Sequence, residues 1–374
     1  MITKDEIRRK ALEIGFGDAG FAGVEPFTSQ LDYIAVDDRY RWTERMGLTL
    51  VKNIDPGVIM ENCRTLIVLL YSYFTASAPV TLERHYGRCY LNDDRVTKNG
   101  LSLMVKEFRS YLRNNGIDTK SAVSMPEKLS AMRAGVGTCG RNTLLYASNT
   151  AGGSSFVFPV VLLTDREFEP DAPSVKNGCP DWCRNACIAA CPTRALTGNG
   201  RIDPSRCISY LSYYGEGATP PELREPMGLS IYGCDRCQNV CPRNTAWITS
   251  GRPGSEKLET MAEDFAPERI LLMDREYFEN RIFPFMFYMK YEDAWRWRMN
   301  AARAMGNSGD RKYIPYLVEG YKKYDDARVR SLIAWALGRL GGDEAAAALK
   351  EFIAGASGEL RAEIESAIAS CPLF

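Results

Sequence analysis

The hydrophobic positions of the first 165 residues switch between helical and extended patterns. Apolar residues recur at helical spacing over 4–14, behind a capping box, and Gly15 can take the left-handed conformation that ends a helix. The same spacing runs over 101–112. Two continuous apolar runs, 66–73 and 156–163, are typical of strands buried on both faces. The pattern predicts a layered α/β domain over residues 1–165.

The C-terminal part carries an internal repeat. The segment Ala302–Gly306 recurs as Ala334–Gly338, and each copy is followed by a polar turn, at Asp310 or Asp343. Paired amphipathic helices that repeat at this distance are typical of a short α-solenoid. Residues 251–374 are therefore predicted to form a linker and HEAT-like helical repeats.

The stretch 166–250 between these parts is rich in proline and glycine and holds eight of the 12 cysteines. Little apolar sequence is left for a core, so bound metal is expected to stabilise this middle domain. The whole chain has one histidine, and its 47 basic residues balance 47 acidic ones, so no global positive field draws it to nucleic acid. The start is charged and the longest apolar run is short, which favours a cytoplasmic protein without a membrane span.

The cysteine spacing specifies the kind of metal. The order is Cys-x3-Cys-x3-Cys-x3-Cys-Pro, one separate cysteine, then Cys-x2-Cys-x3-Cys-Pro. Two Cys-x3-Cys-Pro endings resemble a two-cluster ferredoxin, in which the fourth cysteine of each run binds the other cluster. This pattern assigns one 4Fe–4S cluster to Cys179, Cys183, Cys187 and Cys241, and the second to Cys191, Cys207, Cys234 and Cys237. The first run has wider gaps than usual, which weakens its assignment; the alternative is two zinc sites, or one zinc site plus scattered thiols. The other four cysteines have no spacing partner, and the simplest interpretation makes each a small buried hydrophobe.

Several segments, in order, resemble the epoxyqueuosine reductase family of cobalamin-dependent iron–sulfur enzymes. The matching stretches are Arg133–Thr143 (RAGVGTCGRNT), Leu163–Asp165 (LTD), Ala190–Leu196 (ACPTRAL), Arg206–Leu211 (RCISYL) and Tyr232–Pro242 (YGCDRCQNVCP). The resemblance implies an N-terminal domain that binds cobalamin without a histidine ligand to cobalt. It further implies that the two clusters pass single electrons to cobalt. The family's substrate is an epoxide of a modified base in a tRNA anticodon loop, and its helical repeats help to hold that RNA.

The segment Arg133–Thr143 is the candidate cofactor contact. Gly135, Gly137 and Gly140 supply backbone without side-chain bulk, which a flat macrocycle could approach, although a tight turn between a helix and a strand explains them equally well. Arg141 and Asn142 could bond corrin amides or a nucleotide tail, or could cap a helix end.

Two substrate-side residues depart from the family pattern. The family's proposed proton donor is an aspartate, and Val123 stands at the matching position here. Its Asp-Tyr-His stretch corresponds to Cys89-Tyr90-Leu91. General acid catalysis contributes about 10²–10⁴-fold, so its loss predicts a divergent paralogue that reduces a different substrate. Glu127 is a weak substitute acid, since a helix start also favours glutamate.

The remaining candidates concern partners. His85 is either a proton donor or a ligand near the macrocycle, or an ordinary solvated or partly buried histidine of a charged loop, which is favoured. Trp295 and Trp297 lie among arginines and could stack on RNA bases, but anchoring the first repeat helix is favoured. The leading hypothesis is a reductase served by a flavodoxin- or ferredoxin-type donor. The alternatives are an electron-transfer module that activates a separate corrinoid protein, and a partner-binding protein with structural clusters.

Overall fold

The computed structural model describes residues 2–34, 38–40, 43, 50–91, 100–122, 125–174, 178–198 and 200–372. The fold separates into two compact units, each assembled from three segments of the chain. The first unit combines Met1–Thr75, Asn92–Pro204 and Arg236–Arg252, and the second combines Ala76–Leu91, Ser205–Asp235 and Pro253–Phe374. The domain boundaries expected after residues 165 and 250 stay a prediction.

The first unit is built on a four-stranded antiparallel sheet in the order β1-β2-β6-β3. Its strands are β1 (Asp18–Ala22), β2 (Thr65–Ser72), β3 (Thr119–Ser121) and β6 (Val157–Thr164). Two small hairpins are added by β4 (Gly137–Cys139), β5 (Leu145–Ala147), β7 (Leu196–Gly198) and β8 (Arg201–Ile202). The helices are α1 (Lys4–Ile14), α2 (Leu31–Ile34), α4 (Pro56–Ile59), α7 (Leu101–Asn114), α8 (Glu127–Arg133), α9 (Ala186–Ala189), α12 (Arg236–Asn239) and α13 (Pro242–Thr249).

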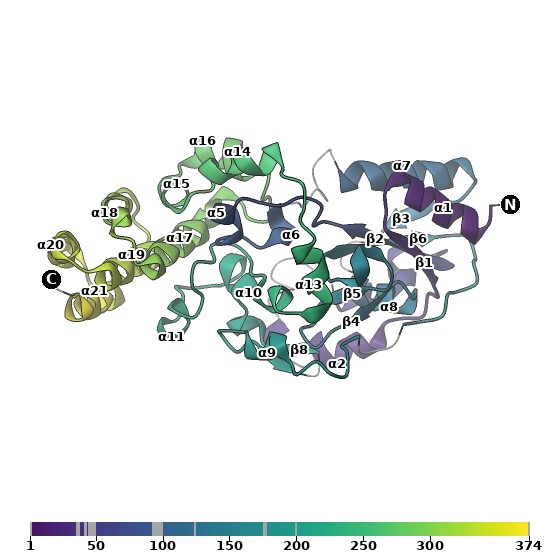
Figure 1. Ribbon diagram of the computed structural model, residues 1–374, viewed down its shortest axis with the longest axis horizontal. Coiled ribbons are helices and arrows are strands. Elements are labelled where there is room, and N and C mark those ends of the chain that lie inside the picture. The colour runs from purple at the N-terminus through teal and green to yellow at the C-terminus, as the bar shows by residue number, and fades with distance from the viewer. Residues whose placement is uncertain are drawn as a thin grey trace. The chain divides into compact units, whose positions relative to one another are not determined.

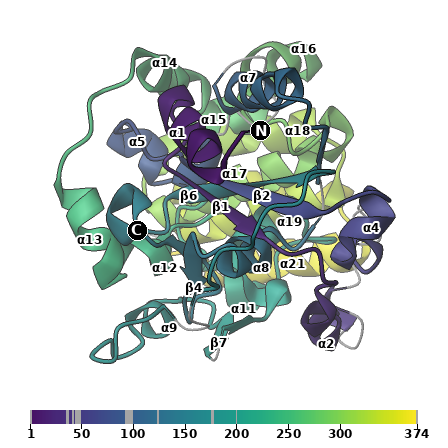
Figure 2. The ribbon, with the colours of Figure 1, turned by 90° about the vertical axis from the view of Figure 1, so that its right-hand side faces the viewer.

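Helices cover both faces of this sheet (Figures 1 and 2), as expected for a layered α/β fold. Alternate residues of β2 point to opposite sides: Ile67 and Leu69 pack with α1 and α7, whereas Leu66, Val68 and Leu70 pack with α8. The expected buried strands and helices are thus confirmed. Helix α1 has the expected capping box between Thr3 and Glu6 and ends at Gly15 in the left-handed conformation.

The second unit is helical. Its elements are α5 (Val80–Glu83), α6 (Arg88–Leu91), α10 (Ile208–Tyr213), α11 (Pro221–Arg224), α14 (Glu256–Asp264), α15 (Pro267–Leu272), α16 (Arg275–Tyr277), α17 (Ala294–Ser308), α18 (Ile314–Lys323), α19 (Ala327–Leu340), α20 (Asp343–Phe352) and α21 (Gly358–Ser370). In the part of the chain that the structure describes, no helix is long and apolar enough to span a bilayer.

The predicted repeat corresponds to stacked helices. A Cβ atom on Gly306 of α17 would lie 2.8 Å from the Cα of Ala336 in α19, and one on Gly338 would lie 2.8 Å from the carbonyl oxygen of Ala367 in α21. Glycine therefore sits where successive helices approach most closely. The repeated Ala–Gly motif of the sequence is the contact surface of the solenoid.

The segment Ser205–Asp235 does have a hydrophobic core, contrary to the expectation of little burial. Ile231 and Tyr232 are fully buried in one cluster with the helices of the second unit, and Ile208 and Met227 are buried as well. The ring of Tyr232 stacks on Trp297 of α17, with centroids 4.7 Å apart. The repeats therefore supply apolar surface that the cysteine-rich sequence lacks.

Candidate iron–sulfur centre

The four cysteines that the spacing assigns to one cluster all belong to the first unit. Burial raises the pKa of the Cys187 thiol, and the thiols of Cys179, Cys183 and Cys241 raise it further. Cys187 lies in α9, and Cys241 caps α13 with Pro242 at its first turn. Cys179 and Cys241, from opposite ends of the cysteine-rich stretch, thus both come within electrostatic reach of Cys187.

Two of these sulfur atoms accept hydrogen bonds from the segment after α8. The backbone N–H of Arg141 donates to Cys179 Sγ at 3.2 Å, and the hydroxyl of Tyr146 donates to Cys241 Sγ at 3.1 Å. Asn142 is buried and donates to the Tyr146 hydroxyl oxygen at 2.8 Å. Donors aimed at sulfur suit thiolates that carry negative charge, so these residues fit a cluster held at this place.

The side chain of Arg141 closes over the same loop. Its Nη1 donates to the carbonyl of Cys183 at 3.2 Å and to Asn185 Oδ1 at 2.9 Å. The structure therefore places Arg141 and Asn142 against the first thiol set. Their expected contact with a corrin stays a prediction.

The three glycines of this segment approach the protein's own atoms. A Cβ on Gly135 would lie 2.5 Å from the carbonyl oxygen of Ala172, and one on Gly137 or Gly140 would lie 2.8 or 2.6 Å from the side chain of Leu145 or Tyr146. Gly135 also has a positive φ of 73°. Close packing in a turn accounts for the glycines, and their role toward a macrocycle stays a prediction.

Buried amides dock the second cysteine run on the sheet unit. Asn244 of α13 accepts from the backbone N–H of Ser155 and donates to the carbonyl of Gln238, each at 2.9 Å. Gln238 of α12 donates to the hydroxyl of Tyr73 at 3.0 Å. Tyr73, Ser155, Gln238 and Asn244 are all buried, so these bonds hold α12, which contains Cys237, and α13, which Cys241 precedes, against the sheet unit.

The second ligand set is divided between the units. Cys191 and Cys237 belong to the first unit, and Cys191 Sγ accepts from the backbone N–H of Ala195 at 3.2 Å. Cys207 and Cys234 belong to the second unit, where Cys207 occupies the N-cap of α10. The assignment of these four cysteines to one cluster stays a prediction. Among the described residues, no three His, Cys, Asp or Glu side chains are close enough to hold a single metal ion, whereas a cluster holds its thiolates further apart.

Other predicted residues have plainer surroundings. His85 is bonded through Nδ1 to the carbonyl of Leu229 at 2.6 Å, and burial lowers its pKa, which matches the ordinary interpretation. Glu127 is the first residue of α8 and half-buried, as a helix start would have it. Val123 lies outside the described residues.

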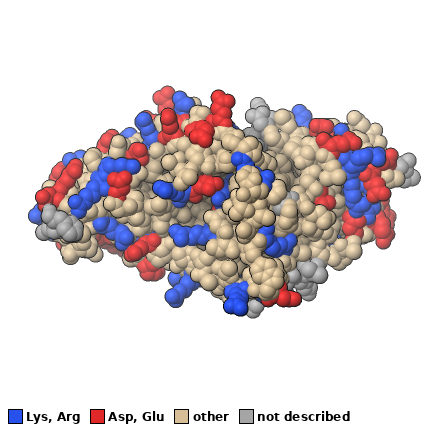
Figure 3. Space-filling view, viewed as in Figure 1, with Lys and Arg blue, Asp and Glu red and all other residues tan. Residues whose placement is uncertain are grey.

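The two tryptophans are anchors, as favoured from the sequence. Trp297 is fully buried, and Trp295 is 8% exposed beneath the guanidinium of Arg328. Neither indole face is open for base stacking. On the face in Figure 3, basic and acidic side chains are interspersed, in keeping with the balanced composition.

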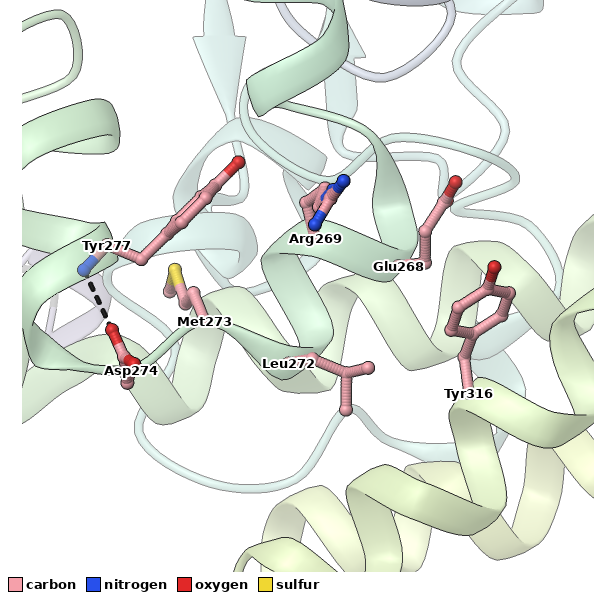
Figure 4. Close-up of a pocket in the computed structure, with 7 residues that line it drawn as sticks. All are labelled: Glu268, Arg269, Leu272, Met273, Asp274, Tyr277 and Tyr316. Carbon is pink, nitrogen blue, oxygen red and sulfur yellow. Dashed lines mark hydrogen bonds between the residues drawn. The ribbon is translucent and has the colours of Figure 1, made fainter.

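A cavity of about 300 Å³ lies in the second unit between α15, α16 and α18. Its lining includes Glu268, Arg269, Asp274, Tyr277 and Tyr316 (Figure 4). Asp274 accepts from the backbone N–H of Tyr277 at 2.8 Å, which is an ordinary helix cap. None of the residues predicted from the sequence lines this cavity.

Sequence reasoning missed Tyr146 and Arg243. Arg243 lies over the Tyr146 ring, 4.7 Å from its centroid, and donates to the carbonyls of Gly178 and Ala147. Burial and then the Cys241 thiol raise the pKa of Tyr146 well above its ordinary value, which keeps the hydroxyl protonated as a donor. The sequence marks these two residues only by their neighbours: Tyr146 lies three residues after the segment Arg133–Thr143, and Arg243 follows Cys241-Pro242.

Comparison with known families agrees with this arrangement. Residues 180–244 match the family model of a 4Fe-4S double cluster binding domain, and residues 289–369 match that of HEAT repeats. The fold and site thus define a two-cluster iron–sulfur protein with a helical-repeat region.

Similar proteins of known function identify the family within this class of iron–sulfur proteins. An epoxyqueuosine reductase from Lactococcus garvieae is 36% identical over 330 residues, covering 84% of this chain and 89% of the relative. The Bacillus subtilis enzyme of the same name is 26% identical over 357 residues, covering 90% and 88%. A solved epoxyqueuosine reductase with a modified tRNA-Tyr stem loop is 25% identical, with a TM-score of 0.80 over 98% of both chains. The chain belongs to the epoxyqueuosine reductase family and is an iron–sulfur oxidoreductase.

Proposed function

We propose that this protein is a reductase that passes single electrons through two 4Fe–4S clusters to a bound cobalamin. The observation that carries the proposal is that Cys187 lies within electrostatic reach of the thiols of Cys179, Cys183 and Cys241, and that the sulfurs of Cys179 and Cys241 accept hydrogen bonds. These four cysteines would hold one cluster. Cys191, Cys207, Cys234 and Cys237 would hold the other.

The protein's own groups set how easily an electron arrives. The Arg141 N–H and the Tyr146 hydroxyl point at Cys179 and Cys241, so both favour the more negative, reduced state of a cluster bound there. Asn142 donates to the Tyr146 oxygen and thereby keeps the hydroxyl hydrogen directed at sulfur. These residues tune electron delivery rather than touch a substrate.

Cobalamin, when bound, supplies a cobalt centre that acts as a strong nucleophile or reductant. The proposal for this chain rests on family membership and on the single histidine. His85 is engaged with the carbonyl of Leu229, which supports cobalamin binding without a histidine ligand to cobalt. Gly135, Gly137 and Gly140 add no support for a bound cobalamin, because they pack closely against other residues of the protein.

The substrate is proposed to differ from epoxyqueuosine. Val123 cannot donate a proton where the family has an aspartate, and Glu127 lies four positions further on as a weaker substitute. A tRNA stem loop is bound by a solved relative, so an RNA-borne substrate is the first class to test. A flavodoxin- or ferredoxin-type protein is the proposed electron donor.

Anaerobic reconstitution with iron, sulfide and hydroxocobalamin, followed by gel filtration, tests the cofactor. A corrin that co-elutes near one-to-one supports the reductase. Clusters without corrin would overturn it and favour an electron-transfer or corrinoid-activating protein. Clusters that cannot be reduced would favour the third hypothesis, a partner-binding protein with structural clusters.

Two further measurements address ligands and substrate. Cys237→Ala should lose about half of the iron and labile sulfide, whereas the control Cys63→Ala should lose none; full iron in Cys237→Ala would refute the ligand assignment. The protein reconstituted with clusters and cobalamin is also tested on an epoxyqueuosine-modified tRNA stem loop. Conversion of the epoxyqueuosine to queuosine would refute the proposal that the substrate differs.

A further inference from the structure

Helix α17 of the HEAT region carries polar side chains on its buried face. Asn300 and Arg303 are fully buried in the middle of a helix whose neighbours are alanines and methionines. Burying an amide or a guanidinium costs free energy unless each is hydrogen-bonded. The hydrogen-bond partners of Asn300 and Arg303 therefore show which segments α17 keeps in place.

Asn300 connects the two cysteine-bearing segments of this unit. Its Nδ2 donates to the carbonyl of Ser212 at 2.8 Å, and the Ser212 Oγ accepts from the backbone N–H of Gly233 at 3.0 Å. Ser212 lies in α10, the helix that Cys207 caps, and Gly233 directly precedes Cys234. One short chain of hydrogen bonds thus links α17 to both cysteine segments.

Arg303 holds the approach to Cys234. Its guanidinium donates to the carbonyls of Gly228, at 2.7 Å, and of Ser230. Asn307, one turn further along α17, donates to the same Gly228 carbonyl at 2.9 Å. These acceptors belong to a loop outside regular secondary structure, whose carbonyls would otherwise lack partners.

The charge of Arg303 is costly where it lies. Burial lowers its pKa to about 9, and the two oxygens to which it donates are carbonyls rather than carboxylates. Neutral leucine or methionine would fill the same space without that cost. The guanidinium is therefore best explained by the loop geometry that it enforces.

We propose that α17 is a positioning element for the second cluster, acting through Asn300 and Arg303 on Cys207 and Cys234. The inference rests on the proposed ligand assignment. The HEAT region then does more than present a binding surface, because its first long helix orders two thiolates for the cluster.

Iron content and cluster spectra test this positioning. Asn300→Ala and Arg303→Met are reconstituted anaerobically as full chains, and iron, labile sulfide and the EPR spin count of the reduced protein are measured. We expect both variants to lose about half of the iron, with the remaining signal matching that of Cys237→Ala. Arg303→Lys should recover iron, since it keeps a donor.

Arg298→Met is the matched control. Arg298 is also a buried arginine of α17, but it donates to the Met273 carbonyl and the Tyr291 hydroxyl, each at 3.0 Å, and not to a cysteine segment. It should keep the full iron content. Equal iron loss in Arg298→Met, or full iron and an unchanged spectrum in folded Asn300→Ala, would overturn the proposal. Far-UV circular dichroism checks that each variant folds. If Arg303→Met does not fold, the iron content of Asn300→Ala alone tests the proposal. Full iron in Cys237→Ala would instead show that the ligand assignment had failed.

Discussion

Replacing Gly306 by alanine probes the contact that stacks α17 on α19. In an isolated helix, replacing glycine by alanine stabilises the helix by about 1 kcal/mol. Here the new Cβ would lie 2.8 Å from both Cα and Cβ of Ala336 and 3.1 Å from the Trp335 ring. Neither alanine atom can rotate away, so the helices must separate. Overpacking of this kind costs about 1–3 kcal/mol, which offsets or exceeds the gain.

Gly320→Ala is the matched control for the intrinsic gain. The atoms nearest to a Cβ at Gly320 of α18 would be side-chain atoms of Leu271, the first at 3.0 Å, and a side chain yields more easily than the backbone that Gly306 meets. Because both variants share the same helix propensity, the difference between their free energies of unfolding isolates the packing cost, about 1–3 kcal/mol. Urea denaturation followed by circular dichroism measures it, with hydrogen exchange of α17 and α19 as a local check. If Gly306→Ala raises the free energy of unfolding as much as Gly320→Ala does, the close contact between α17 and α19 described here is wrong.

Two further predictions concern the sheet unit. Tyr146→Phe removes the hydroxyl that donates to Cys241 Sγ, so the reduction potential of the first cluster should fall by tens of mV, since about 59 mV corresponds to a tenfold change for one electron. An EPR-monitored redox titration checks this, and an unchanged potential would contradict it. Burial alone would raise the pKa of Asp171, but hydrogen bonds from Arg8, Lys4 and a backbone N–H hold it below the ordinary value. The stabilisation is therefore present above about pH 4 and is lost as pH falls through the folded-state pKa. Asp171→Asn should lower the free energy of unfolding at pH 7 by about 1–3 kcal/mol, and the difference from wild type should shrink as the pH falls through the folded-state pKa. Asp5→Asn, whose carboxylate is 91% exposed, should change nothing measurable, and equal effects of the two substitutions would refute the ion-pair argument.

The features predicted well from sequence are those with a local period. Strands β2 and β6, helices α1 and α7, and the stacked Ala–Gly repeats all follow from spacings within one element. The cysteine spacing names the first thiol set in the same way, but the role of these thiols as cluster ligands stays a prediction.

The features missed are contacts between residues far apart in sequence. Tyr146 meets Cys241 across 95 positions, and Asn300 meets Ser212 across 88. Neither residue belongs to a motif, and an amide or a hydroxyl in a helix or strand is compatible with many partners. Only the three-dimensional path of the chain decides which sulfur or loop each one serves.

The segment Ser205–Asp235 shows how the sequence expectation changes once packing is known. A cysteine-rich stretch with little apolar content is expected to fold around its metal. Here the stack on Trp297 holds Tyr232, and the Ser212 hydroxyl holds Gly233, both through contacts within the protein. Cys234 follows directly and so starts from an ordered backbone. If Cys234 is the ligand proposed above, a backbone held by these contacts loses less conformational entropy when the cluster binds than a loop that folds only with it.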